Sequence, residues 1–533
     1  MNFKNLLKCL TFASISMQAY ATECDNINKY FLDTPTAVTE CEVNNSGKVT
    51  LLELKYGPLT ETVVNKLAKY STLETLTVDK MDLDSKLTLS ALKSVKEFTI
   101  NDLIVRDDPV FQKHYLINNV INTLKSVKKL EISGFIISQT TINEVSTLTG
   151  LNELSFNQCN YEDGLNFESL KNIKNLTSLK LNAYSKRLSE IPKPIFSLTN
   201  LKILDLNDQN ISTISNSFGN LKNLKYLDLS RNKLTKFPSA LNNFKKLEFL
   251  DLSNNKIKSI NEVLGNLTNL KELYLDFNSI TAIPDTVGKL INLTKLSLIK
   301  NKISTISSEI GNLKSLISLD ISYNNISSIP SSIGKLTNLK KIYAGDNKVE
   351  IIPNTIGNLN NLEKLSFNRN KVTAIPTTIG NLKNLIELSL DGNKIKAIPN
   401  TIGNLKNLEE MYLFDNQISL IPDTIGNLKS LKVLQLQNNK ITNLPKSLGN
   451  LKNLSTLDLY NNQINDTLPE SLNDLPELTF IDIRGNVNIK GKALSNDSLF
   501  SCYYADNTDN YSLCKTKNTN TDCMVNDKLK ICS

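Results

Sequence analysis

Few residues in this sequence could carry out catalysis. His114 is the only histidine in 533 residues, so a Ser-His-Asp or Cys-His arrangement has one possible base. The sequence contains no GxGxxG, P-loop, HExxH or GxSxG motif. Asp228 and Asp251 could imitate the paired carboxylates of a glycosidase, but that chemistry needs a pocket that desolvates one of them. The sequence therefore predicts a protein that is not an enzyme.

Metal and cofactor sites are also not expected. Asp391-Gly392-Asn393 begins like a calcium loop, but Ile402 stands where the bidentate Glu should be. The cysteines lack the close CxxC pairs of zinc sites. Apart from Cys9, they lie near the two ends of the chain, with Cys159 alone between them: Cys24, Cys41, Cys502, Cys514, Cys523 and Cys532. This placement favours a disulfide-stapled cap at each end, although the sequence leaves three pairings open for the last four cysteines.

The first 21 residues have the order of a secretory signal. Lys4 and Lys8 precede a largely apolar run, and Ala19-Tyr20-Ala21 supplies the small residues of a cleavage site before Thr22. No later apolar run is long enough for a membrane span, so we expect an extracellular, secreted protein. Its ten N-glycosylation sequons permit a glycoprotein, but this is about the chance number in so Asn-rich a chain. A net charge of +8 is too diffuse for nucleic-acid binding.

A 23-residue repeat dominates the chain from Leu201 onward. One unit, from Leu316 to Asn338, reads LISLDISYNNISSIPSSIGKLTN, and its apolar residues recur at the same positions in a dozen units. Looser units precede them. The predicted organisation is a signal peptide (1–21), an N-terminal cap (22–48), irregular repeats (49–200), regular repeats (201–500) and a Cys-rich C-terminal cap (501–533).

The motif LxxLxLxxNxI resembles that of the leucine-rich-repeat family. The closing IPxxIGNLxxL resembles the plant intracellular Ras-group type, whereas the unit containing Leu468-Pro469-Glu470-Ser471-Leu472 resembles extracellular plant receptors. The resemblance implies an α/β leucine-rich-repeat solenoid: a curved horseshoe with a concave parallel β-sheet and disulfide-capped ends.

The spacing itself explains why such coils must stack. Leu319-Asp320-Ile321 alternates as a short strand does, and a single coil buries too few apolar groups to offset its lost conformational entropy. At the ninth position a recurring Asn, such as Asn324, can bond its own and the adjacent coil; Cys159 and Gln209 occupy the same slot. Pro330 is expected to start a helical turn on the outer side, and Gly334 to reverse the chain.

Function is expected on the concave face, where side chains between the core positions are free to vary. Aromatic and basic residues that favour binding recur there, and these are the predicted partner-binding residues: Tyr226, Phe249, Tyr274, Phe277, Ile299, Lys300, Tyr323, Tyr343 and Arg369. Other basic side chains interleave with them: Arg231, Lys295 and Lys341. A second, acidic patch follows along the chain: Glu387, Asp391, Glu410, Tyr412, Phe414 and Asp415. This change of sign suits a polypeptide of mixed charge.

Three functions remain open from the sequence. The favoured one is a secreted recognition scaffold that binds a protein or a cell-surface glycan, with no cofactor. An intracellular signalling scaffold of the Ras-group type would require the signal to be misread and the thiols to be reduced. A polysaccharide-acting enzyme on a parallel β-helix would need several strands in each coil, whereas each unit shows one.

Overall fold

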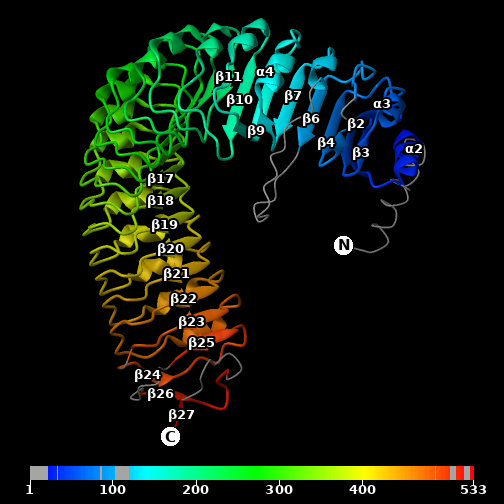
Figure 1. Cartoon of the computed structure of the whole chain (residues 1–533). Helices are drawn as coiled ribbons and strands as arrows, with labels where there is room; N and C mark the ends of the chain where they lie inside the picture. The colour runs from blue at the N-terminus through cyan, green and yellow to red at the C-terminus, as the bar shows by residue number, and fades with distance from the viewer. Residues whose placement is uncertain are drawn as a thin grey trace. The chain divides into compact units, whose positions relative to one another are not determined.

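Figure 1 shows the computed structural model of the chain, which describes residues 22–32, 34–83, 87–101, 119–486, 488–504, 512–520 and 529–532. These residues fall into two compact units, Met1–Asn255 and Lys256–Ser533. The expected signal segment, His114 and Cys523 lie outside the described residues.

The described part of the first unit starts with a helix and an antiparallel hairpin and continues as a parallel sheet. The Cys24–Cys41 disulfide joins helix α2 (Thr22–Phe31) to strand β1 (Ala37–Val43), which pairs antiparallel with β2 (Val49–Lys55). The parallel strands that follow are β4 (Thr75–Asp79), β6 (Glu97–Asn101), β7 (Lys129–Ser133), β9 (Glu153–Tyr161), β10 (Ser178–Ala183), β11 (Ile203–Asp205), β12 (Tyr226–Asp228) and β13 (Phe249–Asp251). Short extra strands are β3 (Pro58–Leu59), β5 (Asp82–Leu83) and β8 (Ile136–Ile137).

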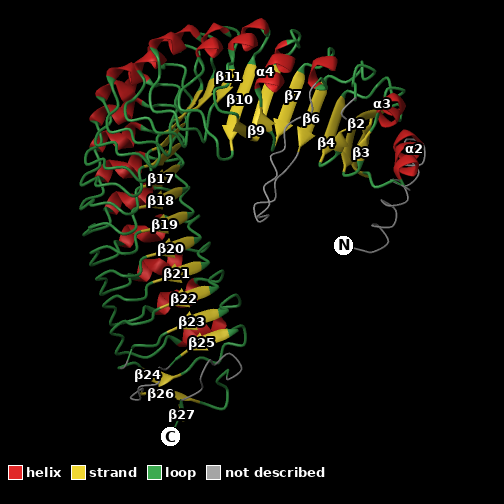
Figure 2. Cartoon of the chain, in the orientation of Figure 1, coloured by secondary structure: helices red, strands yellow, loops and turns green. Residues whose placement is uncertain are grey.

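Helical turns form the other side of this unit. They are α3 (Glu61–Leu67), α4 (Gln139–Ser146) and the 3-10 turns η1 (Ile121–Thr123), η2 (Glu168–Asn172), η3 (Lys193–Ser197), η4 (Asn216–Asn220) and η5 (Ser239–Asn243). Figure 2 shows the strands and the helical turns on opposite sides of the unit.

The second unit repeats one plan in coil after coil. Its parallel strands are β14 (Glu272–Tyr274), β15 (Lys295–Ser297), β16 (Ser318–Asp320), β17 (Lys341–Tyr343), β18 (Lys364–Ser366), β19 (Glu387–Ser389), β20 (Glu410–Tyr412), β21 (Val433–Gln435), β22 (Thr456–Asp458), β23 (Phe480–Asp482) and β25 (Ser501–Tyr503). On the other side lie the 3-10 turns η6 (Glu262–Asn266), η7 (Asp285–Lys289), η8 (Ser308–Asn312), η9 (Ser331–Lys335), η10 (Asn354–Asn358), η11 (Thr377–Asn381), η12 (Asn400–Asn404), η13 (Asp423–Asn427), η14 (Lys446–Asn450) and η15 (Glu470–Asp474).

A small separate sheet closes the second unit. It consists of β24 (Lys490–Lys492), β26 (Ser512–Lys515) and β27 (Lys530–Ile531), and the Cys514–Cys532 disulfide lies in this region. Cys502 is disulfide-bonded as well. The predicted leucine-rich-repeat solenoid with disulfides near both ends is confirmed, and the Cys514–Cys532 bond selects among the pairings that the sequence left open.

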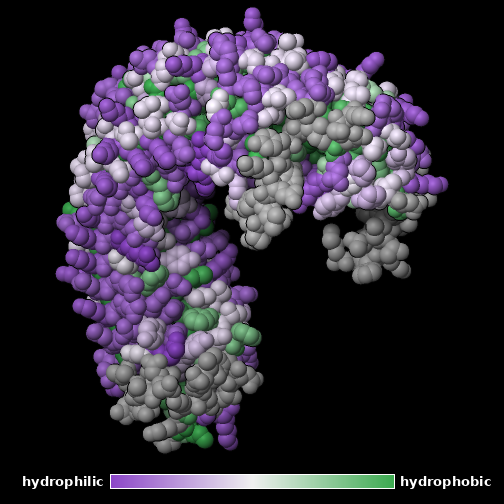
Figure 3. All heavy atoms as spheres, viewed as in Figure 1, coloured by the Kyte–Doolittle hydropathy of each residue, from purple (hydrophilic) through white to green (hydrophobic). Residues whose placement is uncertain are grey.

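The core of each regular coil is the predicted one. In the coil from Leu316 to Asn338, all seven expected apolar side chains are buried: Leu316, Leu319, Ile321, Ile326, Ile329, Ile333 and Leu336. Figure 3 shows that the visible surface outside this core is mostly hydrophilic. Polar side chains thus dominate the surface that surrounds the core.

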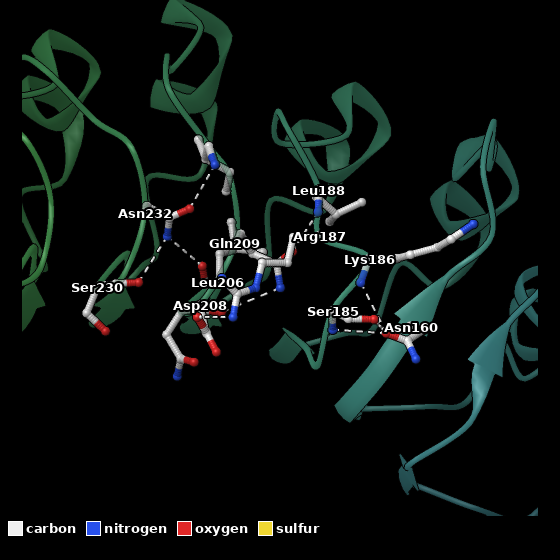
Figure 4. A network of polar contacts seen from close by, with 12 residues as sticks. Asn160, Ser185, Lys186, Arg187, Leu188, Leu206, Asp208, Gln209, Ser230 and Asn232 are labelled. Atoms are coloured by element: carbon white, nitrogen blue, oxygen red, sulfur yellow. Dashed lines mark hydrogen bonds and ion pairs between the residues drawn. The ribbon is translucent and has the colours of Figure 1, made fainter. Parts of the chain in front are cut away.

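The ninth-position side chains form the expected ladder of hydrogen bonds. The Asn324 Nδ2 donates to the carbonyl oxygen of Leu298 in the preceding coil at 2.9 Å and to that of Ile321 in its own coil at 3.0 Å. Its Oδ1 accepts from the Ile303 N–H at 3.0 Å. Asn232 makes the same contacts in the first unit (Figure 4). The amide thus satisfies backbone groups that leave the sheet without a partner.

The two substitutes in that slot bond in the same way. The Gln209 Nε2 donates to the Leu181 carbonyl at 2.6 Å, and its Oε1 accepts from the Leu188 N–H at 2.8 Å. The buried Cys159 is free of any disulfide, and its thiol donates to the Ile132 carbonyl at 3.2 Å. Burial raises the pKa of Cys159 to about 12, so at neutral pH it is an unreactive thiol that serves structure.

The role expected of Gly334 is wrong in one respect. Gly334 lies inside η9 with an ordinary backbone torsion and does not reverse the chain. A Cβ at this position would lie 2.4 Å from the Thr355 carbonyl oxygen of the next coil. Glycine is needed here because the helical turns of neighbouring coils pack with their backbones almost in contact.

Candidate functional site

The nine predicted contact residues divide between the two units. Tyr226 and Phe249 belong to the first, on the adjacent strands β12 and β13, and their rings stack with centroids 4.2 Å apart. Both are partly buried, so each ring covers much of the other. The other seven predicted residues belong to the second unit.

In the second unit three of the predicted residues, in or just after the strands, are partly buried. The Tyr274 hydroxyl donates to Glu272 at 2.6 Å, and the Lys295 ammonium lies 4.8 Å from the centre of the Tyr274 ring. Partial burial raises the pKa of Tyr274, and the bond to Glu272 raises it further. Tyr343 and Ile299 are also partly buried. All three side chains are therefore half-buried, and the hydroxyl of Tyr274 is bonded within the protein.

The residues at the eighth position of each coil behave differently. Phe277 is 45% exposed and Tyr323 51% exposed, and Lys300 and Arg369 are exposed as well. Successive coils place them side by side, because the Phe277 N–H donates to the Ile299 carbonyl at 2.7 Å and the Tyr323 N–H to the Gly345 carbonyl at 2.9 Å. We call the following set the eighth-position ridge: Phe277, Lys300, Tyr323, Asp346 and Arg369.

Every member of the ridge has a left-handed backbone, with φ between 50° and 57°. This conformation costs an ordinary L-residue roughly 1–2 kcal/mol, and Gly, Asn and Asp adopt it most readily. Many other coils use these favoured residues at the same position: Asp208, Asn254, Gly392, Asp415, Asn438, Asn461 and Gly485. Larger side chains also occur there in the first unit: Tyr56, Lys80, Gln158 and Arg231. The bulky residues of the ridge are therefore disfavoured by the fold and gain nothing from core packing.

The ridge also carries charge. The Lys300 ammonium lies 5.1 Å from the centre of the Phe277 ring, and no ion pair joins it to a carboxylate among the described residues. Arg369 lies 3.9 Å from Asp346, and its side chain remains 67% exposed. Apolar and cationic groups thus alternate over the first three coils of the ridge.

Several side chains of the predicted acidic patch are engaged in local contacts. Glu387 pairs with Lys364 at 2.6 Å, Glu410 accepts from the Tyr412 hydroxyl at 2.8 Å, and Asp415 accepts from Asn438 at 2.6 Å. Burial, with the bond to Glu410, raises the pKa of Tyr412 to about 12. Asp391 is buried, and Phe414 is partly buried. The patch is therefore a weaker candidate for charge recognition than the ridge.

A further aromatic cluster was missed in the sequence. The Arg484 guanidinium lies 4.4 Å from the Tyr503 ring centre and 5.5 Å from that of Tyr460, and it pairs with Asp482 at 2.5 Å. Tyr460 and Arg484 hold the seventh positions of their coils, so the rule that selected Ile299 and Phe414 could have found them.

The carboxylate pair considered for catalysis has a structural role. Asp228 and Asp251 lie opposite each other on neighbouring strands. Asp228 accepts from the Ser230 N–H at 2.8 Å, and Asp251 from the Ser253 N–H at 2.7 Å. Each carboxylate thus closes the turn that follows its own strand.

Two further features are absent from the part of the chain that the structure describes. No group of three or more His, Cys, Asp or Glu side chains there could hold a metal ion. Within the same residues, no helix combines the length and apolarity that crossing a bilayer requires.

Comparison with known proteins agrees with this architecture. A family profile described as a leucine-rich repeat region matches residues 132–282, 281–371, 364–439 and 423–496. No curated protein matches the sequence. Among solved structures, a leucine-rich-repeat protein of Leptospira interrogans is 32% identical, with a TM-score of 0.63 over 70% of this chain and 94% of its own.

Two further structures share the fold. An internalin (InlF) of Listeria monocytogenes is 30% identical, with a TM-score of 0.52 over 59% of this chain and 88% of its own. The plant peptide hormone receptor RGFR1, solved in complex with RGF2, is 24% identical, with a TM-score of 0.60 over 90% of this chain and 83% of its own. The repeat spacing, the asparagine ladder and these matches agree, and the chain belongs to the leucine-rich-repeat family.

Proposed function

We propose that this chain is a secreted recognition scaffold that binds a protein through the solvent-facing side of its sheet, and that it is not an enzyme. The observation that carries the proposal is the eighth-position ridge. Phe277 and Tyr323 occupy left-handed positions where the fold favours Asn, Asp or Gly, and they are exposed. Large side chains held at a cost to stability and open to solvent are what a binding surface requires.

The fold gives this proposal a precedent. RGFR1, a plant peptide hormone receptor solved in complex with RGF2, has the same fold, although at 24% identity the likeness extends to the fold alone. The half-buried Tyr274 and Tyr343 lie on strands beside the ridge, with Ser297 and Asp320 between them. A partner protein would meet both, with the ridge making the specific contacts.

Secretion is supported by the thiol chemistry. Cys24–Cys41 and Cys514–Cys532 are disulfides, which persist in oxidising compartments and are rare in the cytosol. In an intracellular signalling scaffold, the second candidate, these cysteines would be reduced.

N-terminal sequencing of the expressed protein, with a count of thiols before and after denaturation, separates the two candidates. Secretion predicts a mature start at Thr22 and one thiol, that of Cys159, which reacts only after unfolding. Retention of Met1 with several thiols that react in the native state would favour the intracellular scaffold.

Binding is tested with an array of extracellular proteins probed with the full chain. The double variant Phe277→Asn, Tyr323→Asn should bind its partners at least tenfold more weakly. It should remain folded, because Asn is native at this position in other coils. The matched control is Ile351→Asn, Leu420→Asn, which removes two side chains exposed by 72% and 59% elsewhere in the same unit. Equal loss in both double variants would contradict recognition through the ridge.

A further inference from the structure

We infer that the ridge takes an amphipathic helix of a partner protein, one that presents an acidic residue between two apolar residues seven positions apart. The inference rests on the proposed function and names the chemistry of its partner. It depends on the order of three ridge residues in successive coils: Phe277, Lys300 and Tyr323.

The spacing of these residues fits a helix. Adjacent parallel strands lie about 4.8 Å apart, so Phe277 and Tyr323, two coils apart, are separated by about 10 Å, with Lys300 midway. In an α-helix, residues i and i+7 lie on one face about 10.5 Å apart, and residues i+3 and i+4 lie between them on that face. In an extended strand the same-face residues i, i+2 and i+4 are about 6.6 Å and 13 Å apart, and neither distance matches.

The charge of the middle group sets the chemistry of the partner. Lys300 forms no ion pair with any carboxylate in the described ranges, and its ammonium sits over the Phe277 ring. A carboxylate at position i+3 or i+4 of the partner would meet this ammonium beside two apolar contacts that exclude water, where an ion pair is stronger than at an open surface.

A glycan fits this arrangement less well. A sugar ring would stack on an aromatic face, but Lys300 already lies over the face of Phe277. A neutral sugar would also supply no carboxylate to pair with the Lys300 ammonium. The observations therefore favour a polypeptide, and a glycan becomes an outcome of the test.

The test titrates fluorescein-labelled synthetic peptides into the full chain and follows their anisotropy at low salt. The probe is a 16-residue alanine-based helix with Leu at positions 4 and 11 and Glu at positions 7 and 8; its matched partner carries Lys at positions 7 and 8. We expect the Glu peptide to bind at least tenfold more tightly than the Lys peptide. Lys300→Glu should reverse this preference, because the charge at the centre of the ridge changes sign.

Variants of the ridge separate recognition from folding. Phe277→Asn and Tyr323→Asn should each weaken the binding of the Glu peptide at least tenfold. The melting midpoint of each variant should equal or exceed that of the wild type, because Asn tolerates the left-handed backbone. Leu420→Asn should leave the affinity unchanged. The melting midpoint identifies any variant that fails to fold.

Three results would overturn the inference: no binding of either peptide to the wild-type chain at millimolar concentration, equal affinity for both peptides, or ridge-dependent binding of cellohexaose without binding of the peptides. If array proteins still bind in a ridge-dependent manner while the peptides do not discriminate, the helix inference fails and the proposed function stands. If no array protein depends on the ridge, the proposed function itself fails.

Discussion

At the scale of single residues, neighbouring positions of the coil obey opposite rules. The ninth position is nearly always Asn because its amide satisfies backbone groups of two coils, as Asn324 does. The eighth position has a fixed left-handed backbone but tolerates Phe, Tyr, Lys and Arg beside Asn, Asp and Gly. The ninth residue therefore serves the fold, and the eighth is where this chain departs from what the fold favours.

Replacing Asn324 with Leu should lower the free energy of unfolding by about 1–3 kcal/mol, because the backbone groups that it serves would be buried without partners. The measurement is the denaturant midpoint. The control is Asn338→Leu: its exposed amide makes one bond, to the Lys314 carbonyl at 2.8 Å, and its loss should cost under about 1 kcal/mol. An Asn324→Leu midpoint equal to that of the wild type would argue against the ladder.

The two positions also differ in how well the sequence predicts them. The recurrence of Asn at the ninth position, with Cys159 and Gln209 as substitutes, was enough to predict the ladder and its buried thiol. The left-handed torsion at the eighth position was not predicted, because residue types as different as Phe277 and Asn438 occupy it. Among the nine predicted contact residues, exposure separates Phe277 and Tyr323 from Tyr274, whose hydroxyl is bonded to Glu272, and the sequence carries no signal of that bond.

At the scale of elements, a coil is a three-residue strand joined to a short 3-10 turn, and neither is stable alone. The strand makes its hydrogen bonds to the neighbouring coils, as Leu319 does opposite Leu296 and Ile342. The turn packs against the next turn at its glycine. Sequence periodicity predicted both elements, but the reason for the glycine became visible only when two coils were placed side by side.

Gly334→Ala should destabilise the protein by about 1–3 kcal/mol, because the new methyl group would lie 2.4 Å from the Thr355 carbonyl oxygen and force two coils apart. Thermal unfolding measures the effect. Gly150→Ala is the matched control, because the nearest atom to its new Cβ, at 3.0 Å, is the flexible Lys128 ammonium. Equal midpoints for the two variants would show that the turns can separate without cost.

At the scale of the whole molecule, the ends are where the repeated contacts stop. Interior coils pack against a neighbouring coil on each side, whereas the first and last coils have such a neighbour on one side only. The disulfides occur near these two ends. The sequence predicted these caps from the clustering of cysteines. It could not pair the final four, because chain spacing does not determine which thiols approach each other in space.

Reduction should loosen the ends before the interior. The Cys24–Cys41 bond closes a loop of about 17 residues, which is worth roughly 3 kcal/mol in chain entropy. With dithiothreitol, amide hydrogen exchange in the β1–β2 hairpin should quicken about a hundredfold, while the coil from Leu316 to Asn338 keeps its protection. Uniform quickening along the chain would mean that the caps hold the whole stack together.

The asparagine ladder has a consequence for how such a gene can change in length. Each rung joins residues about one repeat apart and depends on nothing farther along the chain, so an insertion or deletion of one full period leaves every rung with an equivalent neighbour. A change of any other length must be absorbed within one coil, as in the 24-residue step from Leu454 to Leu478, across which the Asn486 Nδ2 still donates to the Leu459 carbonyl at 3.0 Å. Descendants of this gene should therefore gain or lose whole repeats most readily. Each such change would move the ridge residues by one strand spacing and leave the buried core unchanged.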